Sequence, residues 1–162
     1  MRCFYLFFLI FTPTLVFSQK KAEAPKKMPD FGSLPSYFEK DVLAYKTLPK
    51  DGKLMFVFYD PDCGHCQELG YEINKNIELF EDTQIYFVSM QEKALVAKYI
   101  NTFLPKLKKR KNIGYYHDEE YSFLLKFNPQ NFPSLYLYEA KDKRLLSFLD
   151  GESKIDDLRQ FY

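Results

Sequence analysis

Blocks of apolar residues alternate with polar segments along the chain, and their spacing predicts strands and helices in turn. Residues 53–59 (KLMFVFY) and 84–90 (QIYFVSM) are nearly continuous apolar runs, as expected of strands buried in a parallel sheet. Between them, apolar residues recur every three or four positions, which predicts a helix over 66–80. The same spacing predicts a second helix over 92–103, which Pro105 ends.

The second half of the chain predicts shorter elements. They are a short strand or extended segment at 113–116, a short helix over 119–127, a hairpin of strands 134–138 and 144–149, and a closing helix that runs to Phe161 with Ser153 as its N-cap. A strand–helix–strand order followed by a hairpin and a helix predicts an α/β domain with a central mixed β-sheet flanked by helices.

Residues 1–18 have the pattern of a cleaved export signal. Arg2 supplies a positive start, an apolar run follows, and Ser18 places a small residue before the predicted cut. The apolar run is shorter than a comfortable membrane span. Residues 19–30 (QKKAEAPKKMPD) are rich in Lys, Ala and Pro, which predicts a flexible linker. The folded domain is therefore expected over 31–162, in an exported protein.

Composition and cysteine count narrow the function. The 162 residues include 23 Lys and Arg against 22 Asp and Glu, so the chain lacks the basic excess by which nucleic-acid-binding proteins are recognised. Cys3 lies in the predicted signal, which leaves Cys63 and Cys66 in the mature chain. A disulfide scaffold would use several long-range bridges, which two cysteines so close in sequence cannot form.

The segment Cys63-Gly64-His65-Cys66 joins the predicted buried strand to the predicted helix. A cysteine just before a helix N-terminus lies beside the partial positive charge and the free backbone N–H groups of that helix end. Both stabilise the thiolate and lower the pKa of Cys63. His65 can add a positive charge close by. Gly64 keeps the loop small so that a substrate can reach the sulfur. Cys66 is then placed to attack a mixed disulfide on Cys63 and release the product.

Two other interpretations of the cysteine pair remain open. A structural zinc site needs four ligands, and only His65 and His117 could complete the set, with His65 poorly placed between the two cysteines. An inert disulfide would close so small a loop that it would add little stability. Redox chemistry is favoured over both, and we expect no metal and no cofactor.

With these motifs in view, the chain resembles the thioredoxin superfamily over about residues 52–161. The resemblance rests on MFVFYDPDCGHC, on Phe132-Pro133 before the strand LYLY, and on DGESK before the closing helix. It implies a redox-active Cys63–Cys66 disulfide, and a cis-proline loop in which Phe132 and Pro133 receive the substrate chain. The exported context is most similar to the periplasmic TlpA-like oxidoreductases, which implies a periplasmic location, protein thiols and disulfides as partners, and a membrane electron-transfer partner.

The sequence departs from the superfamily pattern at two positions. The acid that often lies six residues before the first cysteine is Val57 here, so the proton acceptor for Cys66 is unassigned, with Glu68 as a candidate. The Trp usual before the first cysteine is Asp62, whose negative charge should raise the pKa of Cys63 and oppose His65. The direction of electron flow therefore stays open, with reduction of substrates favoured.

The leading hypothesis is an exported thiol-disulfide oxidoreductase that acts on protein cysteines. The alternative is a redox-inert thioredoxin-fold module that binds proteins or acts as a chaperone. A peroxidase is disfavoured, because Asp60-Pro61-Asp62 before Cys63 lacks the Pro and Thr or Ser framework of peroxiredoxins.

Overall fold

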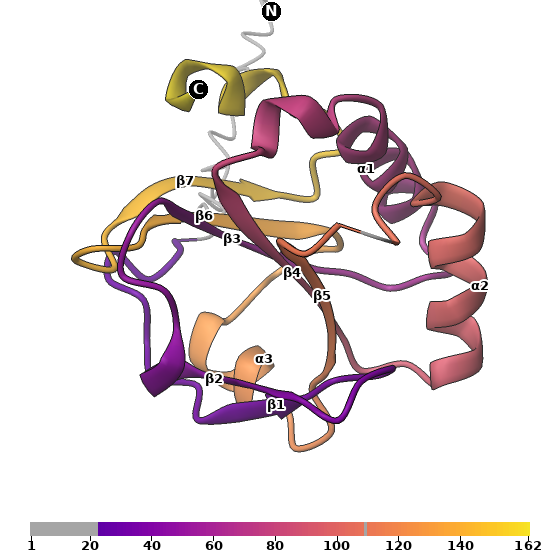
Figure 1. Ribbon diagram of the computed structural model, residues 1–162, viewed down its shortest axis with the longest axis horizontal. Coiled ribbons are helices and arrows are strands. Elements are labelled where there is room, and N and C mark those ends of the chain that lie inside the picture. The colour runs from indigo at the N-terminus through magenta and orange to yellow at the C-terminus, as the bar shows by residue number, and fades with distance from the viewer. Residues whose placement is uncertain (1–22, 109) are drawn as a thin grey trace, which may run out of the picture.

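A five-stranded mixed sheet forms the centre of the molecule (Figure 1). The computed structural model describes residues 23–108 and 110–162, so the predicted export signal over 1–18 lies outside the described residues. The strands of the sheet, in the spatial order β5-β4-β3-β6-β7, are β5 (Ile113–His117), β4 (Thr83–Ser89), β3 (Lys53–Phe58), β6 (Ser134–Glu139) and β7 (Leu145–Asp150). Strands β3, β4 and β5 run parallel, whereas β6 pairs antiparallel with both β3 and β7. The predicted α/β fold with a mixed sheet is confirmed.

Strand β3 is central because nearly all of its side chains are apolar and can be buried on either face. Met55 is paired with Ile85 of β4 on one side and with Leu137 of β6 on the other. Every residue of β3 after Lys53 is buried. The strand therefore delivers the cysteine motif, which follows directly, to the carboxyl edge of the parallel strands, where α/β folds place their sites.

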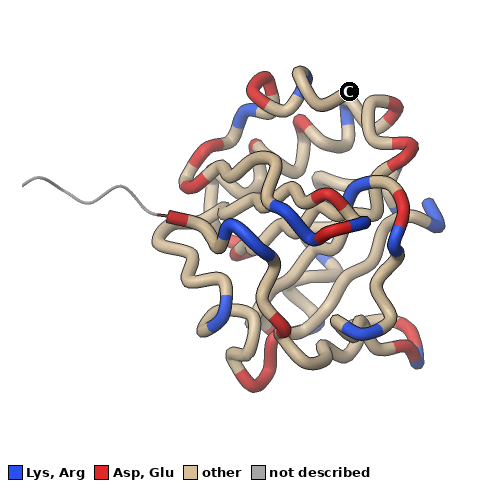
Figure 2. The backbone as a smooth tube through the Cα atoms, turned by 90° about the vertical axis from the view of Figure 1, so that its left-hand side faces the viewer, with Lys and Arg blue, Asp and Glu red and all other residues tan. Residues whose placement is uncertain are grey.

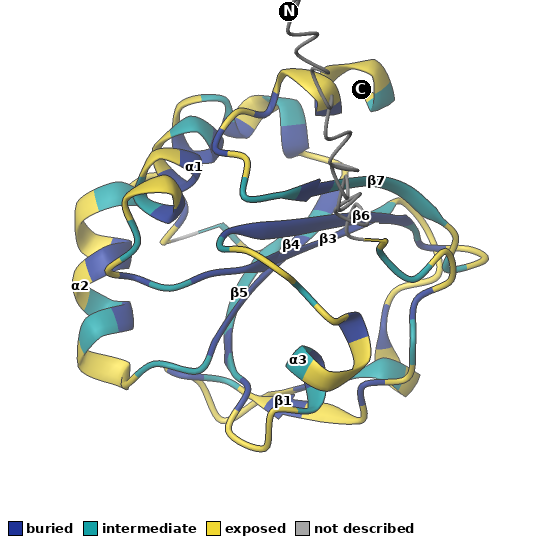
Figure 3. Ribbon diagram, turned by 180° about the vertical axis from the view of Figure 1, so that it is seen from behind, coloured by how far each residue is buried: buried dark blue, intermediate teal, exposed yellow. Residues whose placement is uncertain are grey.

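Successive side chains of β3 point to opposite faces of the sheet and pack into two separate apolar layers. Met55, Val57 and Tyr59 face the layer formed with α1 (Gly64–Lys75) and α2 (Lys93–Phe103). The residues between them face a layer formed with α3 (Ser122–Phe127) and the small hairpin of β1 (Ser33–Pro35) and β2 (Val42–Ala44). Figure 3 shows the buried strands between these covers, with the outer faces of the helices exposed.

Helix α1 ends earlier than the apolar spacing predicts. It stops at Lys75, and Asn76 takes the C-cap position with its side-chain Nδ2 donating to the carbonyl of Glu72 at 2.9 Å. A separate short 3₁₀ helix, η2 (Ile77–Phe80), continues the apolar stripe into the core. The spacing therefore identified the buried side chains over 66–80 but not the break between two helices.

Helix α3 also begins later than predicted, because an aspartate upstream supplies its cap. The buried Asp118 accepts hydrogen bonds from the backbone N–H groups of Phe123 and Leu124, both at 2.9 Å. These groups have no partner within the helix, so the carboxylate satisfies them. The cap also fixes the start of the segment that leads to Phe132.

The predicted N-cap at Ser153 is wrong. The closing helix is a 3₁₀ helix, η3 (Asp156–Phe161), which follows Ile155 without a side-chain cap. The Ser153 hydroxyl instead donates to the carboxylate of Glu68 at 2.7 Å. Ser153 therefore connects the C-terminal segment to α1 and does not cap a helix.

The described part of the flexible linker expected over 19–30 packs against the domain. Met28 is only 3% exposed, and its N–H donates to the carbonyl of Lys143 at 2.9 Å. The N–H of Leu145 donates to the carbonyl of Lys26 at 2.9 Å, so this segment lies along the edge of β7. Burial of the Met28 side chain among the residues under α3 supplies the apolar contact that a solvated linker lacks.

Acidic and basic residues are interspersed along the backbone in Figure 2, and the formal net charge is +1.

After β2, a short 3₁₀ helix, η1 (Tyr45–Thr47), leads toward β3. Within residues 23–108 and 110–162, no helix has the length and apolar character needed to cross a membrane.

Candidate active site

The two cysteines occupy the start of α1 in different environments. Cys63 is the N-cap residue, with extended backbone angles, and it is partly exposed. Its N–H donates to the carbonyl of Asp60 at 3.1 Å, which closes the turn between β3 and α1. Cys66 lies in the first turn of the helix and is only 1% exposed. Both are free thiols, and because only Cys63 is partly exposed, it is the one that an approaching protein can reach.

The N-terminus of α1 provides a favourable setting for a thiolate at Cys63. The first N–H groups of a helix have no partner within it, and the aligned peptide dipoles place partial positive charge there. The first intrahelical bond at this end runs from the N–H of Gln67 to the carbonyl of Cys63, at 3.0 Å. The Cys63 side chain makes no capping hydrogen bond, which leaves its sulfur available for chemistry.

The loop before β6 lies directly beside Cys63. The Sγ atom of Cys63 is 3.8 Å from the carbonyl oxygen of Phe132, within range for a hydrogen bond from the thiol. The peptide bond between Phe132 and the buried Pro133 is cis. The Phe132 ring is partly exposed and stacks on Phe58, with ring centroids 5.2 Å apart. The ring thus packs on the core while its backbone borders the nucleophile.

The Cys66 thiol is held neutral by its surroundings. Burial raises its pKa far above the ordinary value, and the nearby Cys63 and the charge of the Asp60 carboxylate raise it further. One contact acts in the opposite direction, because the backbone N–H of Asp60 donates to Cys66 Sγ at 3.4 Å and lowers the pKa. The motif therefore pairs an accessible thiol with a buried one that does not ionise unaided.

Asp60 is fixed by hydrogen bonds from two directions. Its Oδ1 accepts the backbone N–H of Asp62 at 2.9 Å, and its Oδ2 accepts the side-chain Nε2 of Gln91 at 2.8 Å. Gln91 is itself positioned by the Tyr37 hydroxyl, which lies 2.6 Å from the Gln91 carbonyl and 2.9 Å from that of Ser89. The carboxylate is therefore oriented at the carboxyl ends of β3 and β4.

Two buried tyrosines form the wall behind Cys66. The rings of Tyr59 and Tyr99 lie 4.7 Å apart, and the Tyr99 hydroxyl donates to the carbonyl of Cys66 at 2.8 Å. The Tyr59 hydroxyl is buried and finds no hydrogen-bond partner among the described residues. Burial raises the pKa of both phenols well above the ordinary value, so both stay neutral.

The remaining residues singled out in the sequence have varied positions. Asp62, Gly64 and His65 are exposed beside Cys63, and a Cβ added at Gly64 would meet no atom within 4 Å. The surface over this turn is therefore open to a partner. Val57 is buried in the layer under α1, as an apolar residue should be.

The structure does not favour Glu68 as the proton acceptor for Cys66. Glu68 is exposed, and its Oε2 is used by the Ser153 hydroxyl. Glu68 follows Cys66 by two positions, and residues two positions apart in a helix point to different faces, so closeness in sequence does not bring them together.

His117 lies at the end of β5 with its ring 4.9 Å from that of Tyr37. No group of three or more His, Cys, Asp or Glu residues that could hold a metal ion occurs in the described part of the chain.

Sequence analysis missed the supporting residues of the site. Asp60 enters the sequence analysis only within Asp60-Pro61-Asp62 as an argument against a peroxidase, although an acid three residues before a cysteine is a visible signal. Gln91, Tyr37 and Tyr99 carry no local signal, because the pairing of β3 with β4 brings Gln91 to the motif, and the packing of α2 and of the segment after β1 brings Tyr99 and Tyr37.

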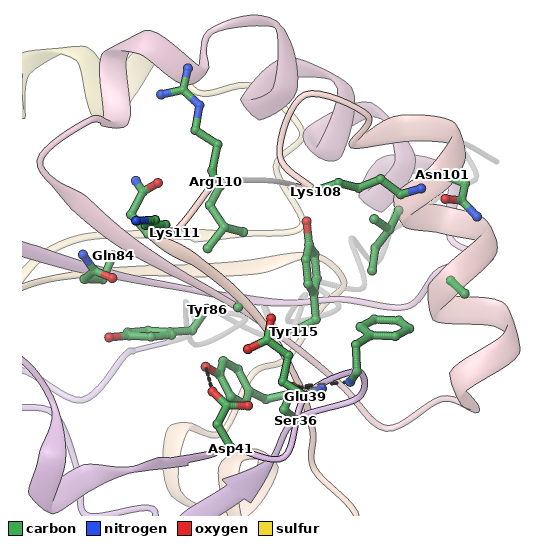
Figure 4. A pocket seen from close by; sticks show the side chains of 17 residues that line it. Ser36, Glu39, Asp41, Gln84, Tyr86, Asn101, Lys108, Arg110, Lys111 and Tyr115 are labelled. Atoms are coloured by element: carbon green, nitrogen blue, oxygen red, sulfur yellow. Dashed lines mark hydrogen bonds between the residues drawn. The ribbon is translucent and has the colours of Figure 1, made fainter.

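A cleft of about 750 Å³ lies away from the cysteines, along the edge strand β5 (Figure 4). It is bordered by α2, by β5 and by the loop that contains Ser36 and Asp41. At its floor the Tyr116 hydroxyl donates to the Asp41 carboxylate at 3.3 Å. Neither Cys63 nor Cys66 lines this cleft, so the candidate active site is the surface at the start of α1.

Comparisons with known proteins agree with this geometry. The family model described as a thioredoxin-like domain matches residues 42–162. Similar solved structures include dsbF of Mycobacterium tuberculosis (TM-score 0.67, 13% identity, 85% of this chain and 96% of that chain). A secreted disulfide oxidoreductase of Mycobacterium tuberculosis (0.64, 11%, 79% and 91%) and StoA of Bacillus subtilis (0.62, 13%, 85% and 98%) share the same fold. Among curated proteins, none matches the sequence.

Proposed function

The chain belongs to the thioredoxin-like family, and on that premise we propose that it is a thiol-disulfide oxidoreductase that exchanges electrons with protein substrates through Cys63 and Cys66. One observation carries the proposal. An accessible thiol at a helix N-terminus and a buried thiol one turn later lie beside the backbone carbonyl of Phe132. This arrangement suits a nucleophile, a resolving thiol and a neighbouring surface for the substrate chain.

The reaction proceeds through a mixed disulfide. The Cys63 thiolate attacks one sulfur of a substrate disulfide, the substrate S–S bond breaks, and its second sulfur leaves as a thiolate. Cys66 then gives up its proton and attacks Cys63 Sγ, which breaks the bond to the substrate and closes the Cys63–Cys66 disulfide. The substrate gains two electrons and two protons, and the protein loses the same number.

The loop at Phe132 and Pro133 is the proposed contact for the substrate chain. Because the Phe132 carbonyl lies within hydrogen-bonding distance of Cys63 Sγ, a chain whose sulfur reaches Cys63 comes close to this loop. His65, Asp62 and Gly64 are adjacent to Cys63 in the chain and are exposed to an approaching partner. We assign to His65 and Asp62 opposing electrostatic effects on the Cys63 thiolate.

Direction and compartment are further proposals. The pattern of residues 1–18 and the likeness to a secreted disulfide oxidoreductase support export to the periplasm. Outside the cytoplasm, a protein that reduces disulfides needs its own supply of electrons, so we propose a membrane electron-transfer partner. The domain then acts as a reductase of exported protein disulfides.

Turnover of a protein disulfide tests the proposal. We expect the protein to accelerate the reduction of insulin by dithiothreitol, and we expect Cys63→Ser to abolish this acceleration. Cys66→Ser should accumulate a mixed disulfide between Cys63 and the substrate, visible as an added mass, because the resolving thiol is missing. A wild-type protein that leaves insulin reduction unchanged, or a Cys63→Ser variant as active as wild type, would favour the redox-inert binding module instead.

A further inference from the structure

The proposed function requires a proton acceptor beside Cys66. Burial raises the pKa of this thiol, and a neutral thiol is a poor nucleophile toward the mixed disulfide on Cys63. Its proton must therefore leave as Cys66 attacks. Val57, in the layer beneath, is apolar, and the carboxylate of Glu68 is used by Ser153 on another face of α1.

The tyrosines around Cys66 do not serve as bases. Besides Cys63, the phenols of Tyr59, just after β3, and Tyr99, on α2, interact with the thiol, and those of Tyr37 and Tyr115 lie behind them beside Tyr59. Burial raises the pKa of each of these four phenols, so each holds its proton at neutral pH. A protonated phenol can donate a hydrogen bond, but it cannot take up a further proton near neutral pH.

Asp60 is the carboxylate whose charge acts on the Cys66 thiol among the described residues. Its backbone nitrogen lies 3.4 Å from Cys66 Sγ, so the main chain of Asp60 contacts the reacting sulfur directly. Asp60 is partly exposed whereas Cys66 is buried, so Asp60 can exchange a proton with solvent that does not reach the thiol. This position suits a group that must collect a proton from the interior and pass it on.

We propose that the Asp60 carboxylate accepts the proton of Cys66 as this thiol attacks the mixed disulfide, and that it returns the proton in the reverse reaction. A carboxylate has about four lone-pair sites, and the hydrogen bonds from Asp62 and Gln91 occupy two of them. Two sites remain to receive a proton. Gln91, which follows β4 and whose backbone carbonyl accepts a hydrogen bond from the Tyr37 hydroxyl, is the positioning residue that orients the carboxylate.

The step is balanced in atoms and electrons. A bond forms between Cys66 Sγ and Cys63 Sγ, and the bond between Cys63 and the substrate sulfur breaks. The bonding electron pair leaves with the substrate sulfur, which departs as a thiolate. The Cys66 proton moves to Asp60 and then to that thiolate or to water, so Asp60 ends the cycle unchanged.

A chromogenic aromatic disulfide, 5,5′-dithiobis(2-nitrobenzoate), separates the two steps of the reduced protein. Attack by Cys63 releases one coloured thiolate, and resolution by Cys66 releases a second. Stopped-flow absorbance therefore reports both rates in one trace. We expect Asp60→Asn, which keeps the backbone N–H to Cys66, to leave the first phase within about twofold and to slow the second by roughly 10²-fold at neutral pH, the usual contribution of a positioned base.

The expected slowing opposes the purely electrostatic effect of the substitution. Removing the negative charge of Asp60 eases ionisation of Cys66, which alone would speed its attack. A slower second phase thus identifies proton transfer rather than a change of local charge. The deficit should shrink as pH rises, because more of the thiol then ionises without a base.

Two variants serve as controls. Asp62→Asn removes the same charge from an exposed position two residues away, beside Cys63. It should change the first phase, on which the Asp62 charge acts, and leave the second phase close to wild type. Asp60→Glu restores a carboxylate and should recover part of the second phase, which a misfolded site would not allow. A second phase in Asp60→Asn as fast as wild type overturns the inference. A wild-type protein without a first phase overturns the proposed function, and the inference with it.

Discussion

The Sγ atom of Cys63 lies 3.8 Å from the carbonyl oxygen of Phe132, although 69 positions separate the two residues in the sequence. The contact exists because β3 and β6 are neighbours in the sheet, paired from Lys53 opposite Glu139 to Phe58 opposite Ser134. The end of one strand and the start of the other therefore meet at the same edge. This meeting point joins the nucleophile to the surface that we assign to the substrate.

Truncating the Phe132 side chain should impair protein substrates selectively. Phe132→Ala removes the ring that stacks on Phe58 beside Cys63, and we expect kcat/KM for insulin reduction to fall about tenfold, a loss of ~1.4 kcal/mol of contact. The small aromatic disulfide should react at the wild-type rate, because it needs no extended contact. Tyr71→Ala is the matched control, as Tyr71 is an exposed aromatic further along α1. Equal losses on both substrates would contradict the assignment of this loop.

The reduced protein should lose stability in mildly alkaline solution through Cys66. Burial raises the pKa of this thiol in the folded state, whereas in the unfolded chain it titrates near ~8.5. Above that pH the unfolded state releases a proton that the folded state keeps, so the free energy of unfolding falls by up to about 1.4 kcal/mol per pH unit. Below that pH the Cys66 thiol is protonated in both the folded and the unfolded state, so its contribution to the free energy of unfolding is fully present.

Urea unfolding of the reduced protein between about pH 7 and about pH 9.5 measures this effect, below the range in which the tyrosines titrate. Cys66→Ala is the control, because it removes the group and should flatten the pH dependence in this window. A variant that keeps the wild-type slope would show that other groups cause it.

Two glycines in α1 should respond oppositely to the same substitution. A Cβ at Gly70 would collide with the Tyr99 ring and hydroxyl, which donates to the carbonyl of Cys66. We expect Gly70→Ala to destabilise the protein by about 1–3 kcal/mol, as overpacking does. Gly64→Ala adds a methyl group in open space and should stabilise it by up to ~1 kcal/mol. Thermal unfolding of both variants checks the pair, and a neutral Gly70→Ala would contradict the close packing of α1 on α2.

The cap of α3 should be worth a measurable part of the stability. Asp118→Ala leaves the N–H groups of Phe123 and Leu124 without their acceptor, and we expect a loss of about 1–2 kcal/mol. Asp118→Asn keeps one carbonyl acceptor and should lose less. Denaturant titration of the two variants measures the difference, and equal stability of Asp118→Ala and wild type would exclude the capping role.

The sequence predicts the sheet better than its surroundings. The apolar runs of β3 and β4 can be buried only in the middle of a sheet, so their pattern has one interpretation. Met28 shows the opposite case, since a single apolar residue in a Lys-rich stretch gave no sign that it would be buried against the layer under α3. Asn76 ends α1 inside a continuous apolar stripe, because the capping hydrogen bond it makes is invisible to spacing.

The site divides in the same way. The paired cysteines are recognisable because their chemistry depends on residues adjacent in sequence. Asp60 and Gln91 meet only because β3 and β4 are parallel neighbours, so their hydrogen bond could not be inferred from either segment alone. Glu68 was a reasonable candidate from its closeness in sequence, and helix geometry directs it to Ser153 instead.

The reduction potential of the Cys63–Cys66 pair tests the central claim most directly. Equilibrating the protein with mixtures of glutathione and glutathione disulfide, followed by alkylation of free thiols, gives the fraction oxidised at each ratio. The account predicts a reversible disulfide with a potential near ~−250 mV or lower, as in a reductant. A potential near ~−180 mV or higher would contradict the reductase direction, and a pair that never forms the disulfide would contradict the oxidoreductase itself.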